Sequence, residues 1–274
     1  MTAFLLANVA SIRLGVFAAV LLTMALWEVL APRRQQKHGR AQRWPSNFGV
    51  LLVDALITRL LIPTTLAAFA ATAVAQGWGL FNVLTVPHWV AIVLSILLLD
   101  LAIYGQHVTF HAVPMFWRLH RMHHADTEFD VTTGIRFHPI EIVLSVLIKM
   151  TIIAALGAPA VAVLVFEILL NATSLFNHSN VAMPQWLDAL VRRLIVTPDM
   201  HRVHHSVAVE ETNSNYGFNL SLWDRVFGTY RPQPKAGQLG MTIGLDAFRD
   251  GDELRLDRML TQPFRDDARI NLDR

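Results

Sequence analysis

Long apolar segments constrain the fold of this chain more than any other feature. They are long enough, or nearly so, for a helix to cross a hydrocarbon core, which takes about 20 apolar residues. The chain is also 53% hydrophobic and only 16% charged, which is unusual for a soluble domain. The segments are Leu14–Ala31, Phe48–Ala75, Trp89–Gly105, Ile140–Leu156 and Ala158–Phe176. We therefore expect an all-α, integral-membrane helical bundle.

The last two apolar segments are shorter than the others and are separated only by Gly157-Ala158-Pro159. Glycine and proline at such a position favour a tight turn, so the pair is predicted to form a hairpin that spans the membrane or re-enters it. The bundle then has four to five spanning or re-entrant helices.

Basic residues indicate how the chain is oriented in the membrane. The loop after the first segment has five basic residues and no acidic one, whereas residues 76–88 contain no Lys or Arg; the five are Arg33, Arg34, Lys37, Arg40 and Arg43. Cytoplasmic loops are enriched in Lys and Arg, so this loop is predicted to be cytoplasmic. Without a targeting signal or an appended domain, we expect the inner membrane of a bacterium. Lipid head groups account for the basic charge, and nothing indicates nucleic acid binding.

The polarity of the chain rises after residue 178, which suggests a division into two parts. Residues 1–231 are expected to form the membrane domain, with cytosolic helices around Trp186–Ile195 and Pro198–Val207. Residues 232–274 are expected to form a polar cytoplasmic tail, in which Asp246–Leu260 could be a surface helix.

Eight of the twelve histidines fall in three groups: His107 and His111; His120, His123 and His124; and His201, His204 and His205. Residues at positions i, i+3 and i+4 of a helix share one face, so imidazoles at this spacing can bind one metal or bridge two. Thr197-Pro198 supplies a helix cap and a first-turn proline just before the last group. Because the chain has no cysteine, the ligands must be nitrogen or oxygen.

The histidine pattern by itself is compatible with more than one class of protein. Lone histidines are usually surface or packed side chains, but a repeated H-x-x-H-H is better explained by a metal. A membrane zinc hydrolase would be expected to contain H-E-x-x-H, and no histidine here is followed by glutamate. A metal carrier or a bis-histidine haem protein would place isolated histidines within the spans, which here are almost free of histidine. A metal carrier or zinc hydrolase is therefore the alternative to an oxygenase.

The region from about Asp100 to Tyr230 resembles the fatty acid hydroxylase and sterol desaturase superfamily. The matching motifs are Trp117-Arg118-Leu119-His120-Arg121-Met122-His123-His124, Arg136-Phe137-His138-Pro139, Asn177-His178-Ser179-Asn180, His201-Arg202-Val203-His204-His205-Ser206, Asn215-Tyr216-Gly217 and Trp223-Asp224-Arg225-Val226-Phe227-Gly228-Thr229-Tyr230. This resemblance implies a cytosolic helical cap over a membrane stem. It also implies two iron ions held by histidines. Zinc can replace these iron ions in a purified sample.

Carried over to this chain, the resemblance implies the ligands His107, His111, His120, His123, His124, His201, His204 and His205, with His178 as a ninth and His138 as a tentative tenth. Some relatives have a further histidine four residues before His178, where this chain has Ser174. Because a ligating imidazole usually donates its other N–H to an oxygen, we also expect supporting roles for Asp100, Asp126, Asp130, Asn180, Asp199 and Asn215.

The activity implied by the resemblance is oxidation of a lipid C–H bond by dioxygen, either hydroxylation or desaturation. The substrate would be a fatty acyl chain, a sterol or a related lipid that enters from the bilayer. Since the chain has no cysteine, and the segments before Leu14 and after Pro232 are too short for a redox domain, electrons are expected from a separate cytochrome or ferredoxin type of protein.

Overall fold

Five long helices form the stem of the molecule. The computed structural model describes residues 8–84 and 86–266, and this part of the chain contains no β-strand, only isolated bridges. The long helices are α2 (Val9–Leu30), α3 (Arg40–Leu61), α6 (His88–Ala112), α8 (Pro139–Leu156) and α9 (Ala160–Asn177). Each is, or belongs to, one of five segments that are long and apolar enough to cross a membrane. The predicted all-α membrane bundle is confirmed.

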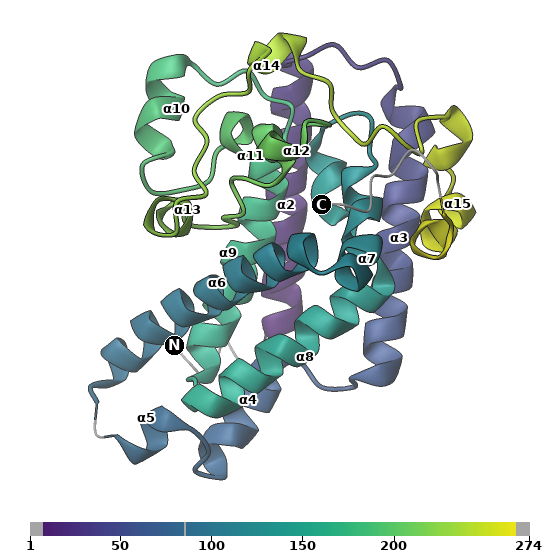
Figure 1. Cartoon of the computed structure of the whole chain (residues 1–274). Coiled ribbons are helices and arrows are strands. Elements are labelled where there is room, and N and C mark those ends of the chain that lie inside the picture. Colours follow the sequence, from purple (N-terminus) through teal and green to yellow (C-terminus); the bar gives the residue numbers. More distant parts are fainter. Residues whose placement is uncertain (1–7, 85, 267–274) are drawn as a thin grey trace.

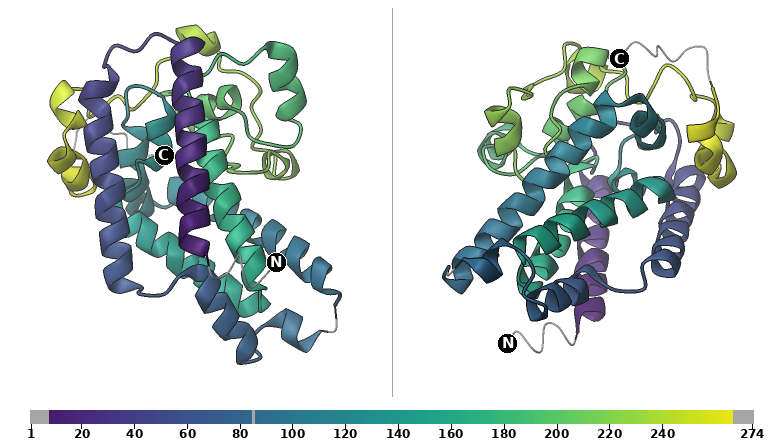
Figure 2. Two further views of the ribbon diagram at one scale, coloured as in Figure 1. Left: turned by 180° about the vertical axis from the view of Figure 1, so that it is seen from behind. Right: turned by 60° about the horizontal axis from the view of Figure 1, so that its bottom comes forward.

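Short helices gather at one end of this stem and form a cap (Figure 1, top). They are α7 (Pro114–His124), α10 (Gln185–Val191), α11 (Pro198–His204), α12 (Val209–Thr212), α13 (Leu222–Val226), α14 (Gly237–Gly240) and the 3₁₀ helix η1 (Val131–Ile135). At the opposite end lie α4 (Leu66–Ala75) and α5 (Leu80–Val83), as both views in Figure 2 also show.

The predicted hairpin between α8 and α9 forms, and its turn depends on glycine. Gly157 ends α8 in a left-handed conformation, with φ of 64°. A Cβ at this position would collide with the carbonyl of Trp78, so a larger residue would be both strained and blocked. The two helices pack with α4 and α6 around a core that contains Leu99, Ile153 and Phe166.

The second apolar segment, Phe48–Ala75, is not one continuous helix. Helix α3 begins earlier, at Arg40, and ends at Leu61, and α4 starts at Leu66. Pro63 explains the break, because it lacks an N–H and disfavours helical backbone in the residue before it. With ten residues, α4 is too short to cross a bilayer alone.

The C-terminal segment differs from the single helix expected over Asp246–Leu260. The structure has the 3₁₀ helix η2 (Gly251–Leu254), then α15 (Leu256–Thr261) and the 3₁₀ helix η3 (Gln262–Phe264). Phe248 breaks the pattern: its φ is 58°, and its side chain is buried against Trp117 and Ala125. Burial of this ring thus takes precedence over helix formation.

The polar tail packs against the cap. The guanidinium of Arg118 on α7 donates to the carbonyl of Pro263 at 2.7 Å, and that of Arg121 donates to the carbonyl of Gln262 at 2.8 Å. A domain boundary at residue 231 stays a prediction. The last eight residues of the predicted tail lie outside the described part of the chain.

Candidate metal centre

Nine buried histidines meet where the stem joins the cap, in two groups that could each hold a metal ion. The five-histidine group consists of His107, His111, His120, His124 and His204, and the four-histidine group of His123, His178, His201 and His205. In each group the candidate ligand atoms lie within 4.8 Å of one another. The two groups are adjacent, since the ring of His124 stacks on that of His205 with centroids 4.5 Å apart.

Helix geometry positions most of these side chains. His107 and His111 lie one turn apart near the end of α6, and the second sequence group lies in the last two turns of α7. His201 and His204 are on α11, where the Thr197 hydroxyl accepts a hydrogen bond from the backbone N–H of Met200 as expected for a cap. His178 is the C-cap of α9, and His205 that of α11.

The ring nitrogens of the four-histidine group show what the site can bind. Nδ1 of His123 donates to the carbonyl of Arg136 at 3.1 Å, and Nδ1 of His178 donates to that of Ser174 at 2.8 Å. Carbonyl oxygens only accept, so these nitrogens carry the protons. The Nε2 atoms of His123 and His178 nevertheless lie 3.1 Å apart. If both rings are neutral, two lone pairs face each other, and a cation between them removes the repulsion.

Burial keeps these rings neutral. It lowers the pKa of His178 to about 3 and that of His123 well below its ordinary value of 6.5, with the neighbouring imidazoles adding to the effect for His123. Imidazole nitrogens bind zinc at about 2.0–2.1 Å, so two nitrogens about 3 Å apart could both bind one ion. The 3.1 Å contact therefore fits two ligands of a shared ion.

The five-histidine group repeats this arrangement. Nδ1 of His107 donates to the carbonyl of Tyr216, and Nδ1 of His120 donates to Oε1 of Glu141, each at 2.7 Å. The Nε2 atoms of His107 and His120 are 3.1 Å apart. Several further ring nitrogens are buried without a hydrogen-bond partner: Nδ1 of His124 and of His201, Nε2 of His204, and both nitrogens of His205. These donors fit transition-metal ions that accept imidazole.

His138 lies apart from both groups. Its Nδ1 accepts a hydrogen bond from the backbone N–H of Ile140 at the start of α8, and its Nε2 donates to the carbonyl of Leu260 at 3.1 Å. Both ring nitrogens are thus occupied by backbone groups. The structure gives His138 a capping role that also ties α15 to α8.

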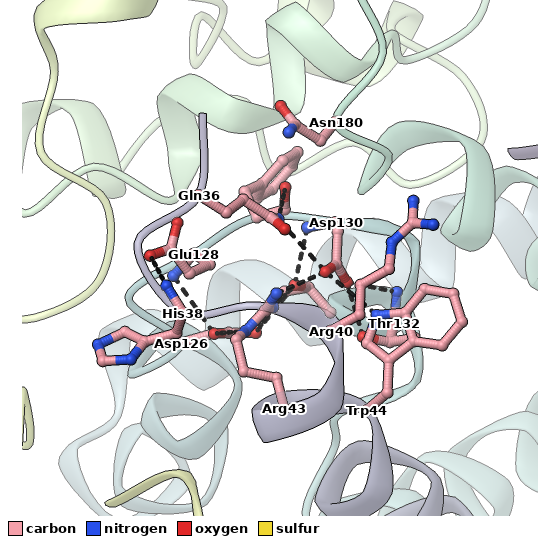
Figure 3. A network of polar contacts seen from close by, with 12 residues as sticks. Gln36, His38, Arg40, Arg43, Trp44, Asp126, Glu128, Asp130, Thr132 and Asn180 are labelled. Carbon is pink, nitrogen blue, oxygen red and sulfur yellow. Dashed lines mark hydrogen bonds and ion pairs between the residues drawn. The ribbon is translucent and has the colours of Figure 1, made fainter. Parts of the chain in front are cut away.

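Two of the expected supporting residues, Asp126 and Asp130, bind arginine (Figure 3). The guanidinium of Arg43 lies 2.6 Å from Asp126 and 2.5 Å from Asp130, and all three side chains are buried. Burial alone would raise the pKa of Asp126, but the charge of Arg43 lowers it below its ordinary value. This ion-pair network fixes the loop between α7 and η1, which leads to the carbonyl of Arg136 that binds His123.

The other four supporting candidates also hold the surrounding chain. Asp100 accepts a hydrogen bond from the indole N–H of Trp223 at 2.8 Å, and Asp199 forms ion pairs with Arg33 and Arg202. The side chain of Asn180 exchanges hydrogen bonds with the backbone of Arg34. The side chain of Asn215 binds the backbone of Met200 and Arg231. Asn215 has a φ of 51° and precedes Tyr216, whose carbonyl binds His107.

The direct partners of the imidazoles were missed from the sequence. Glu141 binds His120, the carboxamide oxygen of Asn213 accepts from Nδ1 of His111 at 3.3 Å, and the remaining partners are backbone carbonyls. Backbone carbonyls leave no trace in a sequence. Glu141, in contrast, could have been found from the sequence, because an acidic residue inside an apolar segment is costly in a membrane and is often functional.

Comparison with known proteins agrees with this geometry. A family model described as fatty acid hydroxylase matches residues 92–229, which is half of the chain and includes all nine histidines. The chain belongs to the fatty acid hydroxylase family. The superfamily resemblance read from the sequence motifs is thereby confirmed.

Several curated proteins are similar to this fatty acid hydroxylase family member. The ornithine lipid hydroxylase OlsE of Rhizobium tropici is 32% identical over 57% of this chain and 47% of its own length. An alkylglycerol monooxygenase of Xenopus tropicalis is 28% identical over 57% of this chain and 34% of its own length. The chain thus spans less than half of the length of these relatives. No solved structure matches it.

A cavity of about 400 Å³ in the stem of this family member leads to the histidines. His107 and His120 line it, and so does Phe137, which stacks on the ring of His123 with centroids 4.3 Å apart. Much of the remaining wall is apolar, with Phe17, Leu51, Ile103, Phe110 and Ile142. The volume is within the range of small-molecule sites.

Proposed function

We propose that this chain is a membrane-bound di-iron oxygenase that hydroxylates or desaturates a C–H bond of a lipid, with dioxygen and external electrons as co-substrates. The proposal is supported by the pairing of imidazole lone pairs in two adjacent groups beside an apolar cavity in the stem. The names of the relatives, which are lipid hydroxylases and monooxygenases, support a lipid as the substrate.

When bound, iron would supply the reduction of dioxygen and the abstraction of hydrogen from an unactivated carbon. The residues of the chain have other tasks. The apolar wall holds the alkyl chain of the lipid, and Phe110 and Phe137 exclude water where the cavity meets the histidines. Glu141 holds the ring of His120 in the orientation that leaves Nε2 free to bind metal.

The orientation in the membrane follows from the basic loop between α2 and α3. This loop lies on the cap, where Arg33 pairs with Asp199 at 2.9 Å and the Arg34 guanidinium donates to the carbonyl of Met241 at 2.7 Å. Because such loops are usually cytoplasmic, we infer that the histidines face the cytoplasm of a bacterial cell. A separate cytochrome or ferredoxin type of protein would then deliver electrons there.

The test is the metal content and absorbance of detergent-purified, iron-supplied protein beside a variant with His123→Ala and His204→Ala. These substitutions remove one ligand from each group. We expect about two irons per chain in the wild type and a loss of iron in the variant, followed by oxygen incorporation from isotope-labelled dioxygen into an added lipid. One zinc, or no metal, in iron-supplied wild type would contradict the proposal and favour a zinc hydrolase or a metal carrier.

A further inference from the structure

Four side-chain oxygens on residues that line the cavity are buried without a hydrogen-bond partner, in addition to Oε2 of Glu167, whose carboxylate pairs with Arg13. The four come from three helices: Oδ1 of Asp54 and Oγ1 of Thr58 on α3, Oε1 of Gln106 on α6, and Oε2 of Glu141 on α8. An unpartnered polar atom is costly inside a membrane, so a group of them needs an explanation. With both carboxyl groups ionised, the carboxylate and amide oxygens only accept hydrogen bonds, and the Thr58 hydroxyl can also donate one. A ligand that fits them must be rich in donors.

Two of these acceptors belong to carboxyl groups. The Asp54 residue is 5% exposed and the Glu141 residue 3%, and both line the cavity from helices α3 and α8, which contact each other. Oε1 of Glu141 is already used by His120, which leaves Oε2 for a ligand. This part of the cavity is therefore acidic and lies beside the five-histidine group.

The cations that line the cavity have other partners or neighbours. The guanidinium of Arg13 pairs with Glu167 at 3.1 Å, Lys149 lies near the same carboxylate, and the guanidinium of Arg59 donates to the carbonyl of Pro63 at 2.6 Å. Along α8, Lys149 is eight residues beyond Glu141, which corresponds to about 12 Å. The chain thus offers no basic side chain of its own, among the described lining residues, to neutralise Asp54.

We propose that Asp54, Thr58, Gln106 and Glu141 form a subsite for the primary ammonium group of an amino-bearing lipid. An ammonium group supplies three N–H donors and a positive charge, which match the acceptors and the two carboxyl groups. The inference rests on the proposed function in that it names the substrate class of the same cavity. It places the amine of that lipid next to the five-histidine group.

The test is binding to iron-loaded protein in phosphatidylcholine nanodiscs, measured by calorimetry with empty nanodiscs as the blank. The probes are dodecylamine, dodecanol and dodecyltrimethylammonium, which share one alkyl chain. We expect the wild type to bind dodecylamine at least about tenfold more tightly than the other two, the size expected of one charge-assisted hydrogen bond. Dodecyltrimethylammonium carries a positive charge but no N–H group, so it shows whether binding depends on the hydrogen-bond donors or on the charge alone.

Two variants complete the test. Asp54→Asn should remove the preference for dodecylamine and leave dodecanol binding unchanged. Asp257→Asn is the matched control, since Asp257 is exposed on α15 and pairs with Arg255, and it should keep the preference. Equal binding of dodecylamine and dodecanol by the wild type, or a preference that survives Asp54→Asn in protein with an unchanged melting temperature, would overturn the proposal.

The two proposals fail in different measurements. The ammonium subsite is judged from binding constants, and the oxygenase proposal from iron content and oxidised lipid. If the protein prefers dodecylamine but oxidises no lipid, the subsite proposal stands and the oxygenase proposal is contradicted. A protein that binds dodecylamine and dodecanol equally but oxidises a lipid would contradict the subsite and keep the oxygenase proposal.

Discussion

The two histidine groups differ in what supports them. In the five-histidine group, His120 donates directly to the carboxyl group of Glu141. In the four-histidine group, His123 and His178 donate to backbone carbonyls, and the nearby Asp126 and Asp130 are bound to Arg43. One group is thus supported directly by a carboxyl side chain, whereas the other depends on a loop that an ion pair holds in place. Under the proposed function, metals held by the two groups should therefore respond differently to substitutions.

Lowering the pH should have the largest effect on stability, because both groups consist of buried, neutral imidazoles. Burial lowers the pKa of His178 in the four-histidine group to about 3, against 6.5 for an ordinary histidine, and also lowers the pKa of His124 and His204 in the five-histidine group. Above about pH 6.5 these imidazoles are neutral in the folded and the unfolded chain, so stability is fully present. Between about pH 6.5 and 3 the unfolded chain binds protons that the folded chain excludes, so stability falls.

This prediction is checked by the melting temperature of metal-free protein in detergent between about pH 8 and pH 4. We expect a plateau above about pH 6.5 and a steep fall below it. A melting temperature that stays constant down to about pH 4 would mean that the imidazoles are hydrated or already charged in the folded protein.

Arg43→Ala tests the loop that supports the four-histidine group. The substitution leaves two carboxylates buried without their cation, which should destabilise the protein by about 3–5 kcal/mol. Because the same loop leads to the carbonyl that binds His123, the four-histidine group should lose metal first. The measurements are the melting temperature and the metal content. Arg255→Ala is the control, since Arg255 forms an exposed ion pair, and it should change neither. Loss of metal from the five-histidine group alone would contradict this expectation.

Glu141→Gln tests the carboxyl group that supports the five-histidine group, and its effect should be smaller. Glutamine keeps an acceptor for Nδ1 of His120 but removes the charge. Loss of such a partner typically lowers metal affinity about 10–100-fold. Competition with a chelator should therefore remove one of the two metals more easily and leave the other unchanged. Equal weakening of both metals would show that the charge of Glu141 is shared by the whole centre.

The sequence determined much of the fold, because the signals are local. Apolar segments of membrane length predicted the long helices, Gly157 and Pro159 predicted the hairpin, and the spacing of the histidines predicted that each group shares a helix face. Pro63 was also a local signal for the break in the second segment, although hydrophobicity alone concealed it. The motifs were enough to recognise the family.

Tertiary structure decided how the histidines are divided. His120, His123 and His124 are close in sequence, yet His123 lies in one group and the other two lie in the second. The partners that settle this, such as His178 for His123 and Glu141 for His120, are 55 and 21 residues away. Periodicity determines which side chains share a helix face, but only the packing of helices against one another determines which imidazoles face the same metal.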